Sequence, residues 1–222
     1  MAEQKPRRTP LADAADRLAQ VTRATGGAIA MAEVPFLTQI NLRLDPASPA
    51  ADTVGKELGL ALPTEAGTSA RSGDISVLWL GPDEWLVVGP PGATERLTAQ
   101  LRSAAGTEHT SVVEVSAQRT TLALGGSRVR DLLALGCAVD VHARAFGVGD
   151  CTQTMLAHAP VVLLRREPGE GAAAEPAFWV LVRASFAAHL VDWLEDASVE
   201  FTADAALQFG TSSSHQARRS TD

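Results

Sequence analysis

Short stretches of apolar and β-branched residues recur along this chain, several of them alternating with polar positions as half-buried strands do. Turn-forming Gly, Pro, Asp and Ser separate many of these stretches. The pattern predicts strands over residues 39–44, 75–80, 85–88, 112–116, 120–124, 161–165 and 178–183.

Helical spacing of apolar residues occurs between the predicted strands. Thr9-Pro10 has the form of an N-cap followed by proline at the first helical position, and Gly26-Gly27 ends the run of apolar residues that follows. Residues 47–74 are expected to form a loop that contains one brief helix, located around an apolar patch at residues 58–62. Further helices are expected over 94–104, over 128–135 before Gly136, and from a Ser185 cap to about 196.

A hairpin followed by a helix occurs twice. Trp85-Leu86-Val87-Val88 and Trp179-Val180-Leu181-Val182 occupy equivalent places in the two occurrences, 94 residues apart. This order predicts an α+β fold with mostly antiparallel sheets, packed helices and a degenerate internal duplication. The expected domain layout is a flexible N-terminus over 1–8, one domain over 9–203 with sub-lobes of about 9–106 and 107–203, and a disordered tail over 204–222.

Composition narrows the possible roles. The 222 residues are 45% hydrophobic, enough for a sizeable core, and the formal net charge is −7. Nucleic-acid-binding proteins usually carry a basic surface, so a nucleic-acid partner is not expected. The apolar runs are strand-sized, so no membrane association is expected either. Two cysteines, Cys137 and Cys151, are too few for a disulfide framework and favour a cytoplasmic location.

Several residues have the chemistry of active sites, but each also has a structural interpretation. Asp83 and Glu84 could divide acid and base roles, yet Pro82-Asp83 is also typical of a reverse turn. Cys151 could be a nucleophile only beside a base or cation. Cys137, Asp140, His142 and Cys151 could together bind a metal ion. Their spacing in the sequence, however, includes none of the compact ligand pairs that are typical of structural zinc sites.

The glycine-rich and basic segments can likewise be interpreted either as binding sites or as structural features. Gly125-Gly126-Ser127 and Gly147-Val148-Gly149 could bind phosphate, but both lack a complete nucleotide fingerprint and suit turns. The pairs Arg128/Arg130 and Arg165/Arg166 could contact an acidic partner or a phosphate, or could be solvated ends of elements. The tryptophans are expected mainly in the core, with one or two as interface anchors: Trp79, Trp85, Trp179 and Trp193. We therefore expect no catalytic, cofactor-binding or metal-binding residue in this chain.

The middle and C-terminal parts resemble the folate-binding fold of the glycine-cleavage aminomethyltransferase and its relatives. The resemblance rests on a strand, a Leu-x-Leu strand, a Gly-led helix and a return to two strands. The matching segments are Val113-Glu114-Val115-Ser116, Leu122-Ala123-Leu124-Gly125-Gly126, Val129-Arg130-Asp131-Leu132-Leu133, Gly149 and Thr152-Gln153-Thr154. Glu114 replaces the aspartate of that family's motif.

Within that superfamily the chain most resembles the gamma subunit of heterotetrameric sarcosine oxidase, over roughly residues 8–201. The segments that carry this resemblance are Leu80-Gly81-Pro82-Asp83-Glu84-Trp85-Leu86, Leu135-Gly136-Cys137-Ala138-Val139-Asp140-Val141-His142, Phe146-Gly147-Val148-Gly149-Asp150-Cys151-Thr152-Gln153-Thr154 and Arg183-Ala184-Ser185-Phe186.

The resemblance implies a non-catalytic subunit that assembles with alpha, beta and delta chains. The implied complex oxidatively demethylates sarcosine to glycine, releases hydrogen peroxide and passes the one-carbon unit to tetrahydrofolate. It implies FAD, FMN, NAD, tetrahydrofolate and zinc on the other subunits. Two alternatives remain open: a stand-alone folate-binding transferase or regulator that uses Glu114, and a free-standing enzyme that uses Cys151.

Overall fold

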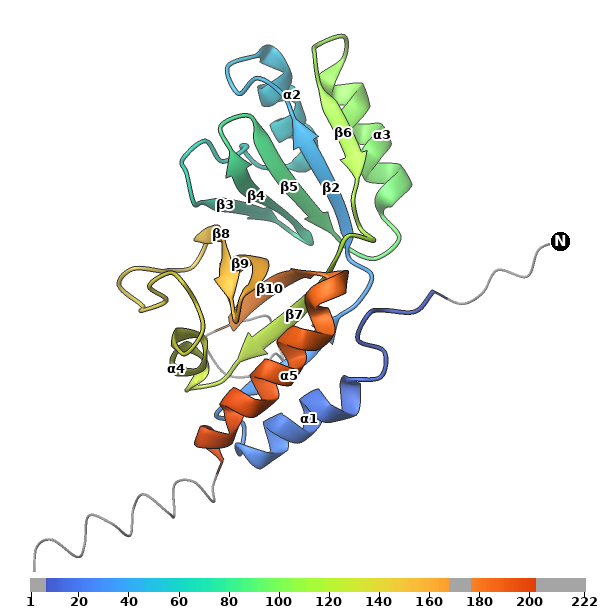
Figure 1. Ribbon diagram of the computed structural model, residues 1–222. Helices are drawn as coiled ribbons and strands as arrows, with labels where there is room; N and C mark the ends of the chain where they lie inside the picture. Colours follow the sequence, from blue (N-terminus) through green and yellow to red (C-terminus); the bar gives the residue numbers. More distant parts are fainter. Residues whose placement is uncertain (1–6, 168–176, 203–222) are drawn as a thin grey trace, which may run out of the picture.

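Two five-stranded antiparallel sheets form the centre of the protein in the computed structural model, which describes residues 7–167 and 177–202 (Figure 1). Sheet A has the order β1 (Ala30–Val34), β7 (Arg119–Gly125), β10 (Ala177–Arg183), β9 (Ala159–Arg166) and β8 (Cys151–Leu156). Sheet B has the order β3 (Ser69–Ser72), β4 (Ile75–Gly81), β5 (Glu84–Gly89), β2 (Thr38–Arg43) and β6 (Ser111–Glu114).

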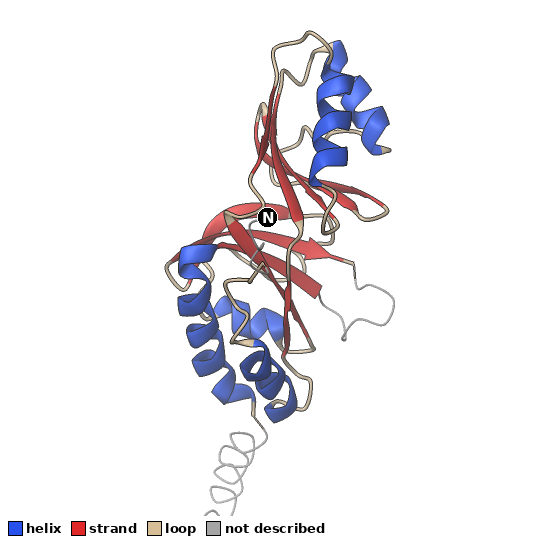
Figure 2. Cartoon of the chain, turned by 90° about the vertical axis from the view of Figure 1, so that its right-hand side faces the viewer, coloured by secondary structure: helices blue, strands red, loops and turns tan. Residues whose placement is uncertain are grey.

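Helices cover the outer faces of both sheets, so the layers run helix, sheet, sheet, helix (Figure 2). On sheet B lie α2 (Pro49–Leu58) and α3 (Thr94–Ala105). On sheet A lie α1 (Ala15–Ala24), α4 (Val129–Ala134) and α5 (Ala187–Ser198). Short 3-10 turns at Ala184–Phe186 and Val199–Phe201 flank α5. The expected α+β class with antiparallel sheets is confirmed.

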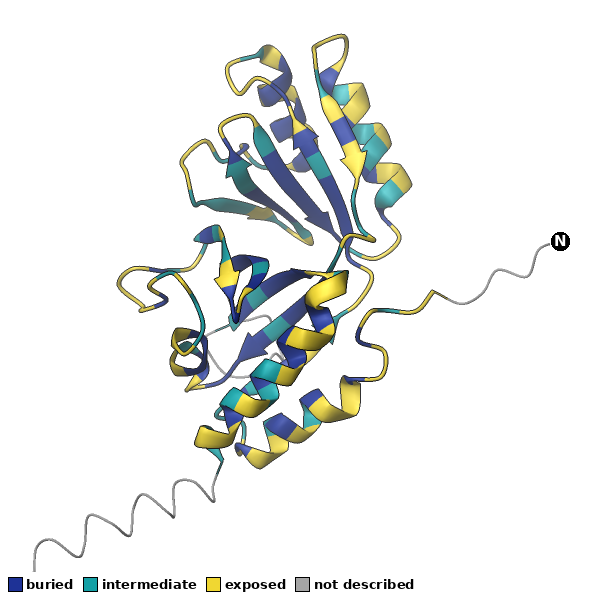
Figure 3. Cartoon of the chain, in the orientation of Figure 1, coloured by how far each residue is buried: buried dark blue, intermediate teal, exposed yellow. Residues whose placement is uncertain are grey.

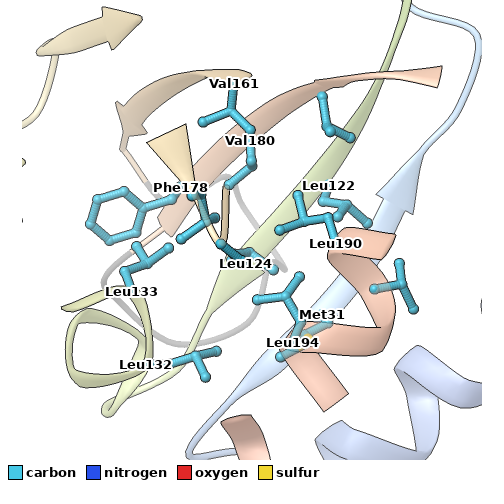
Figure 4. Packing of buried hydrophobic residues seen from close by; sticks show 14 of the residues in the cluster. Met31, Leu122, Leu124, Leu132, Leu133, Val161, Phe178, Val180, Leu190 and Leu194 are labelled. Carbon is cyan, nitrogen blue, oxygen red and sulfur yellow. The ribbon is translucent and has the colours of Figure 1, made fainter. Parts of the chain in front are cut away.

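Three apolar clusters follow from this layering. One lies between sheet A and its helices, where α5 packs Leu190 and Leu194 toward the β7 residues Leu122 and Leu124 (Figure 4). A second lies between sheet B and its helices and includes Trp85. The third joins the two sheets through Leu37, Leu78, Leu86, Val88, Cys151, Val162, Leu164 and Leu181. The helices bury only their inner sides (Figure 3).

The strand orders reveal the internal duplication. The series β2, α2, β3, β4, β5, α3 has the same order as β7, α4, β8, β9, β10, α5, and β5 and β10 both occupy the central position of their sheets. The two tryptophan motifs differ in phase, however. Trp85 faces the helix side of sheet B, whereas Trp179 faces the interface between the sheets. A one-residue shift reverses the face of every side chain in a strand, so the residues of β10 that share the orientation of Trp85 are Phe178 and Val180.

Each sheet takes an edge strand from the other half of the sequence. β1 pairs with β7 in sheet A, although it precedes every strand of sheet B. β6 pairs with β2 in sheet B, although it follows residue 106. The residues of each sheet layer are therefore not those of one predicted sub-lobe, 9–106 or 107–203, because each layer includes an edge strand from the other.

Several boundaries differ from the sequence prediction. The first helix begins at Ala15, because the Thr9 hydroxyl donates to Glu33 Oε2 at 2.8 Å and caps nothing. Ser185 lies in a 3-10 turn, and α5 begins at Ala187. The brief helix expected near 58–62 instead ends at Leu58, where Gly59 adopts the left-handed conformation. Residues 1–6 of the flexible segment predicted over 1–8, and the tail predicted over 204–222, lie outside the described residues, as do residues 168–176.

Candidate functional site

The adjacent carboxylates Asp83 and Glu84 are bound to different partners. Asp83 accepts two hydrogen bonds of 3.0 Å from Arg43 Nη2, at the end of the hairpin. This interaction raises the pKa of Arg43. Glu84 begins β5 and accepts a 2.7 Å hydrogen bond from Asn41 Nδ2 on β2. The two acids therefore tie the hairpin to β2 and form no shared acid and base site.

The Cys151 thiol is buried between the two sheets, with 1% of its surface exposed. Its Sγ donates to the carbonyl oxygen of Thr68 at 3.1 Å. Burial raises the pKa of Cys151 to about 11. A nucleophilic cysteine requires the opposite shift, so the thiol of Cys151 is largely protonated and unreactive at neutral pH.

The four candidate metal ligands have separate local roles. Cys137 is half-buried against the core of sheet A, and burial raises its pKa. Asp140 Oδ1 accepts from the backbone N–H of His142 at 2.8 Å, and His142 Nδ1 accepts from that of Arg144 at 3.2 Å. Over residues 7–167 and 177–202, no group of three or more His, Cys, Asp or Glu residues could hold a metal ion.

Both glycine segments form close backbone contacts. Gly126 has a φ of 103°, and a Cβ there would lie 2.3 Å from the carbonyl oxygen of Ala28. The helix that follows, α4, has only six residues and provides no extended N-terminal anion site. Gly149 has a φ of 91° and its carbonyl oxygen accepts from Ser69 N and Oγ at 2.8 and 2.7 Å. These contacts connect β3 of sheet B to the loop before β8 of sheet A.

Arginines of both predicted basic pairs lie against aromatic rings, so they are not simply solvated ends of helices and strands. Arg130 and Arg165 place their guanidinium carbons 5.1 and 5.4 Å from the Phe178 ring centroid. Arg130 also donates to the carbonyl oxygens of Val141 and Phe146. Burial lowers the pKa of Arg130, and the neighbouring Arg165 contributes to the lowering. Arg128 is ion-paired with Asp131 at the surface.

Arg166 lies beside Trp179 on the face of sheet A that meets sheet B. Its guanidinium carbon is 3.6 Å from the Trp179 ring centroid. Burial and the positive charge of Arg71 on β3 lower the pKa of Arg166 to about 10. Arg71 and Arg166 line one cavity of about 490 Å³. Arg71 was not predicted as a site residue from the sequence, because the pattern around it does not indicate a strand.

The remaining tryptophans have mainly packing roles. Trp85 is fully buried and donates from Nε1 to the carbonyl oxygen of Pro63 at 2.7 Å. Trp79 pairs with Trp85 across β4 and β5. Trp193 on α5 packs over Gly136, where a Cβ would lie 2.5 Å from the indole ring. None of these positions identifies an interface anchor.

Glu114 ends the edge strand β6 and is exposed. Its Oε1 accepts from the backbone N–H of Ser116 at 3.2 Å, which is a local turn contact. In the part of the chain that the structure describes, no helix has the length and apolar character needed to cross a membrane.

Comparisons with known proteins place these observations in a family. The model of the sarcosine oxidase gamma subunit family matches residues 43–200. A sarcosine oxidase subunit gamma from Corynebacterium sp. (strain P-1) is 38% identical over 89% of this chain and 93% of its own length. A subunit of the same name from Arthrobacter sp. is 38% identical, over 88% and 91% of the two chains.

Solved structures agree with the sequence relatives. A chain of the heterotetrameric sarcosine oxidase from Corynebacterium sp. U-96, in complex with pyrrole 2-carboxylate, superposes with a TM-score of 0.78 at 36% identity. The alignment covers 89% of this chain and 97% of that one. The glycine cleavage system aminomethyltransferase T from Bartonella henselae shares the fold, with a TM-score of 0.59 at 14% identity over 78% of this chain and 48% of its own. The expected resemblance is thus confirmed by sequence and by fold, and the chain belongs to the sarcosine oxidase gamma subunit family.

Proposed function

We propose that this chain is a non-catalytic assembly subunit of a heterotetrameric sarcosine oxidase, with alpha, beta and delta subunits as its partners. The observation that carries the proposal is the match to gamma subunits over nearly nine tenths of the chain, including a chain from a solved heterotetramer. The complex would oxidatively demethylate sarcosine to glycine, release hydrogen peroxide and transfer the one-carbon unit to tetrahydrofolate in the cytoplasm.

The non-catalytic role is supported by what the candidate side chains do. Asp83 and Glu84 bind Arg43 and Asn41, and Cys151 is buried with a raised pKa. General acid–base and nucleophilic catalysis both need groups that reach a substrate and titrate near the working pH. We infer that FAD, FMN, NAD, tetrahydrofolate and zinc are held by the other subunits.

A two-sheet body covered by helices is suited to an assembly role because its cores are complete without a ligand. Large apolar side chains nevertheless remain exposed on its surface, including Val113 on β6, Leu135 after α4 and Val199 after α5, at 49%, 52% and 59%. Burial of such side chains in subunit interfaces would stabilise a complex by roughly 25 cal/mol per Å² of apolar area removed from water.

Co-expression tests the proposal. The alpha, beta and delta subunits are produced with and without this chain, and flavin content, subunit masses and sarcosine-dependent peroxide release are measured. We expect omission to give unstable or incompletely assembled subunits. Recovery of an equally stable and fully active three-chain enzyme would contradict the proposal.

The alternative, a stand-alone folate-binding protein, has a separate test. The full chain is titrated with tetrahydrofolate, and Glu114→Gln is compared with the wild type. We expect no saturable binding that depends on Glu114, because its carboxylate is engaged in a local turn on an exposed edge strand. Tight binding lost in Glu114→Gln would favour the alternative.

A further inference from the structure

The cavity between the edges of the two sheets joins positively charged side chains from both layers. Its volume is about 490 Å³, which lies within the usual range of small-molecule sites. Sheet B contributes β3 and β4, and sheet A contributes β9 and the loop before β8. The residues that line it on the two sides include Ser69, Arg71 and Ser76, and Gly149, Leu164 and Arg166.

Strand register directs the two arginines into the same space. Arg71 is directly opposite Ser76 in the β3–β4 pair, so both lie on one face of sheet B. Ser76 is two positions before Leu78, which belongs to the cluster between the sheets. Arg166 is two positions after Leu164, which belongs to the same cluster. Arg71 and Arg166 therefore both extend from the faces where the sheets meet.

Two of the arginines that line this cavity, Arg71 and Arg166, have no acidic partner within the described part of the chain. Over residues 7–167 and 177–202, Arg71 and Arg166 form no ion pair, and Arg71 Nε donates only to the carbonyl oxygen of Gly73 at 2.9 Å. Glu167 lines the cavity but is exposed and forms no ion pair with either arginine. Arg71 is exposed and Arg166 is partly buried, and their like charges repel each other. A bound anion would offset this repulsion.

The walls of the cavity are held in place by direct contacts between the layers. Thr68 and Asp150 form an isolated antiparallel bridge, and Cys151 N donates to the carbonyl oxygen of Gly67 at 2.8 Å. Trp179 supports the Arg166 guanidinium from one side. Such contacts fix the strands that carry the two arginines before a ligand arrives, which reduces the entropic cost of binding.

We propose that this cavity binds an oxyanion, a carboxylate or a phosphate group, between Arg71 of sheet B and Arg166 of sheet A. Guanidinium groups bind both oxyanions through paired N–H donors. The buried Ser76 and the partly buried Ser69 add polar atoms to the cavity wall. The anion adds a contact between two layers that already meet through an apolar cluster and the backbone contacts at Thr68 and Gly149, so its binding stabilises the fold. The site does not depend on the proposed assembly role.

The full chain with inorganic phosphate provides the test. Its thermal unfolding is followed while sodium phosphate replaces sodium chloride at constant ionic strength. We expect a saturable rise in the unfolding midpoint. Arg71→Gln and Arg166→Gln should each weaken phosphate binding about tenfold or more, the loss expected for one charge-assisted hydrogen bond. Arg166→Lys should restore part of the response.

Arg96→Gln is the matched control, because Arg96 is exposed on α3 and bonds only Gln100 among the described residues. It should respond to phosphate like the wild type. In chloride alone, Arg71→Gln should unfold at or above the wild-type midpoint, since it removes the repulsion from Arg166. Equal effects of phosphate and chloride on the wild type would overturn the proposal, as would an equal loss in Arg96→Gln.

The source of the anion is settled by repeating the titration on the co-purified complex. A response in both the chain and the complex assigns the site to a free anion. A response in the chain alone, with reduced assembly of Arg71→Gln and Arg166→Gln, supports the same oxyanion chemistry supplied by a carboxylate of a partner subunit.

Discussion

Trp85 donates its indole N–H to the carbonyl oxygen of Pro63 at 2.7 Å, and this bond joins the central strand of sheet B to the segment after α2. Trp85 is also fully buried beneath α2 and α3. One side chain thus fixes both the packing of the hairpin and the course of a proline-containing loop.

Trp85→Phe removes this donor and leaves the Pro63 oxygen without its partner. We expect a loss of about 1–3 kcal/mol in the free energy of unfolding, measured by urea denaturation. Trp193→Phe is the control, because the Trp193 indole N–H donates to no protein group in the described residues. A loss in Trp193→Phe as large as that in Trp85→Phe would contradict the importance of the Pro63 bond.

Gly126→Ala should destabilise the protein more than an alanine at another positive-φ glycine. The new Cβ would lie 2.3 Å from the backbone oxygen of Ala28, which cannot move away as a flexible side chain could. Gly92 has a φ of 79° and open space within 4 Å of an added Cβ, so Gly92→Ala should cost only about 1–2 kcal/mol. Gly126→Ala should cost on the order of 3–5 kcal/mol. Equal losses, measured by chemical denaturation, would show that the close approach to Ala28 is unimportant.

Alkaline pH should weaken the fold through Cys151. Its pKa is about 11 in the folded protein against 9.0 as the reference value, so its thiolate forms more readily in the unfolded chain. The contribution of the Cys151 thiol to stability is therefore fully present below pH 9 and is lost as the pH rises through about 11. The chain has no tyrosine to add a phenol titration in this range. Cys151→Ala should show a smaller fall in stability between pH 9 and 11 than the wild type, measured by denaturation at each pH. Identical slopes would contradict the burial effect.

The carboxylates of the hairpin should be dispensable for turnover. Asp83→Asn and Glu84→Gln, each incorporated into the co-purified complex, should retain kcat within about twofold of the wild type. A residue that acts in general acid–base catalysis normally contributes about 10²- to 10⁴-fold. A hundredfold fall in sarcosine-dependent peroxide release, with assembly intact, would return these acids to the active-site candidates.

Local sequence pattern predicted the elements whose apolar residues face a core. The strands β4, β5, β9 and β10 and the helix α3 agree closely with the expected segments, because burial imposes a regular spacing on them. The pattern failed for β1, which is partly alanine at a sheet edge, and for β3, whose Ser-Ala-Arg-Ser sequence is held by pairing with β4. Such strands depend on tertiary contacts more than on their own composition.

The anion cavity could not have been predicted from spacing. Arg71 and Arg166 belong to different sheets, and they line one cavity because contacts such as the Thr68–Asp150 bridge join the layers. The repeated Trp-containing motif shows the same limit, since matching letters at Trp85 and Trp179 point to opposite sides of their sheets. By contrast, the family motifs around Leu80–Leu86 and Phe146–Thr154 are continuous in sequence and identified the family directly.

Assembly with the other subunits is the proposed role of this chain, and co-purification tests that role. This chain is tagged, co-expressed with the alpha, beta and delta subunits, and purified for analysis of subunit masses, flavin absorbance and sarcosine-dependent peroxide release. We expect a yellow, active complex of four chains. A colourless single chain recovered from cells that contain all four subunits would contradict it.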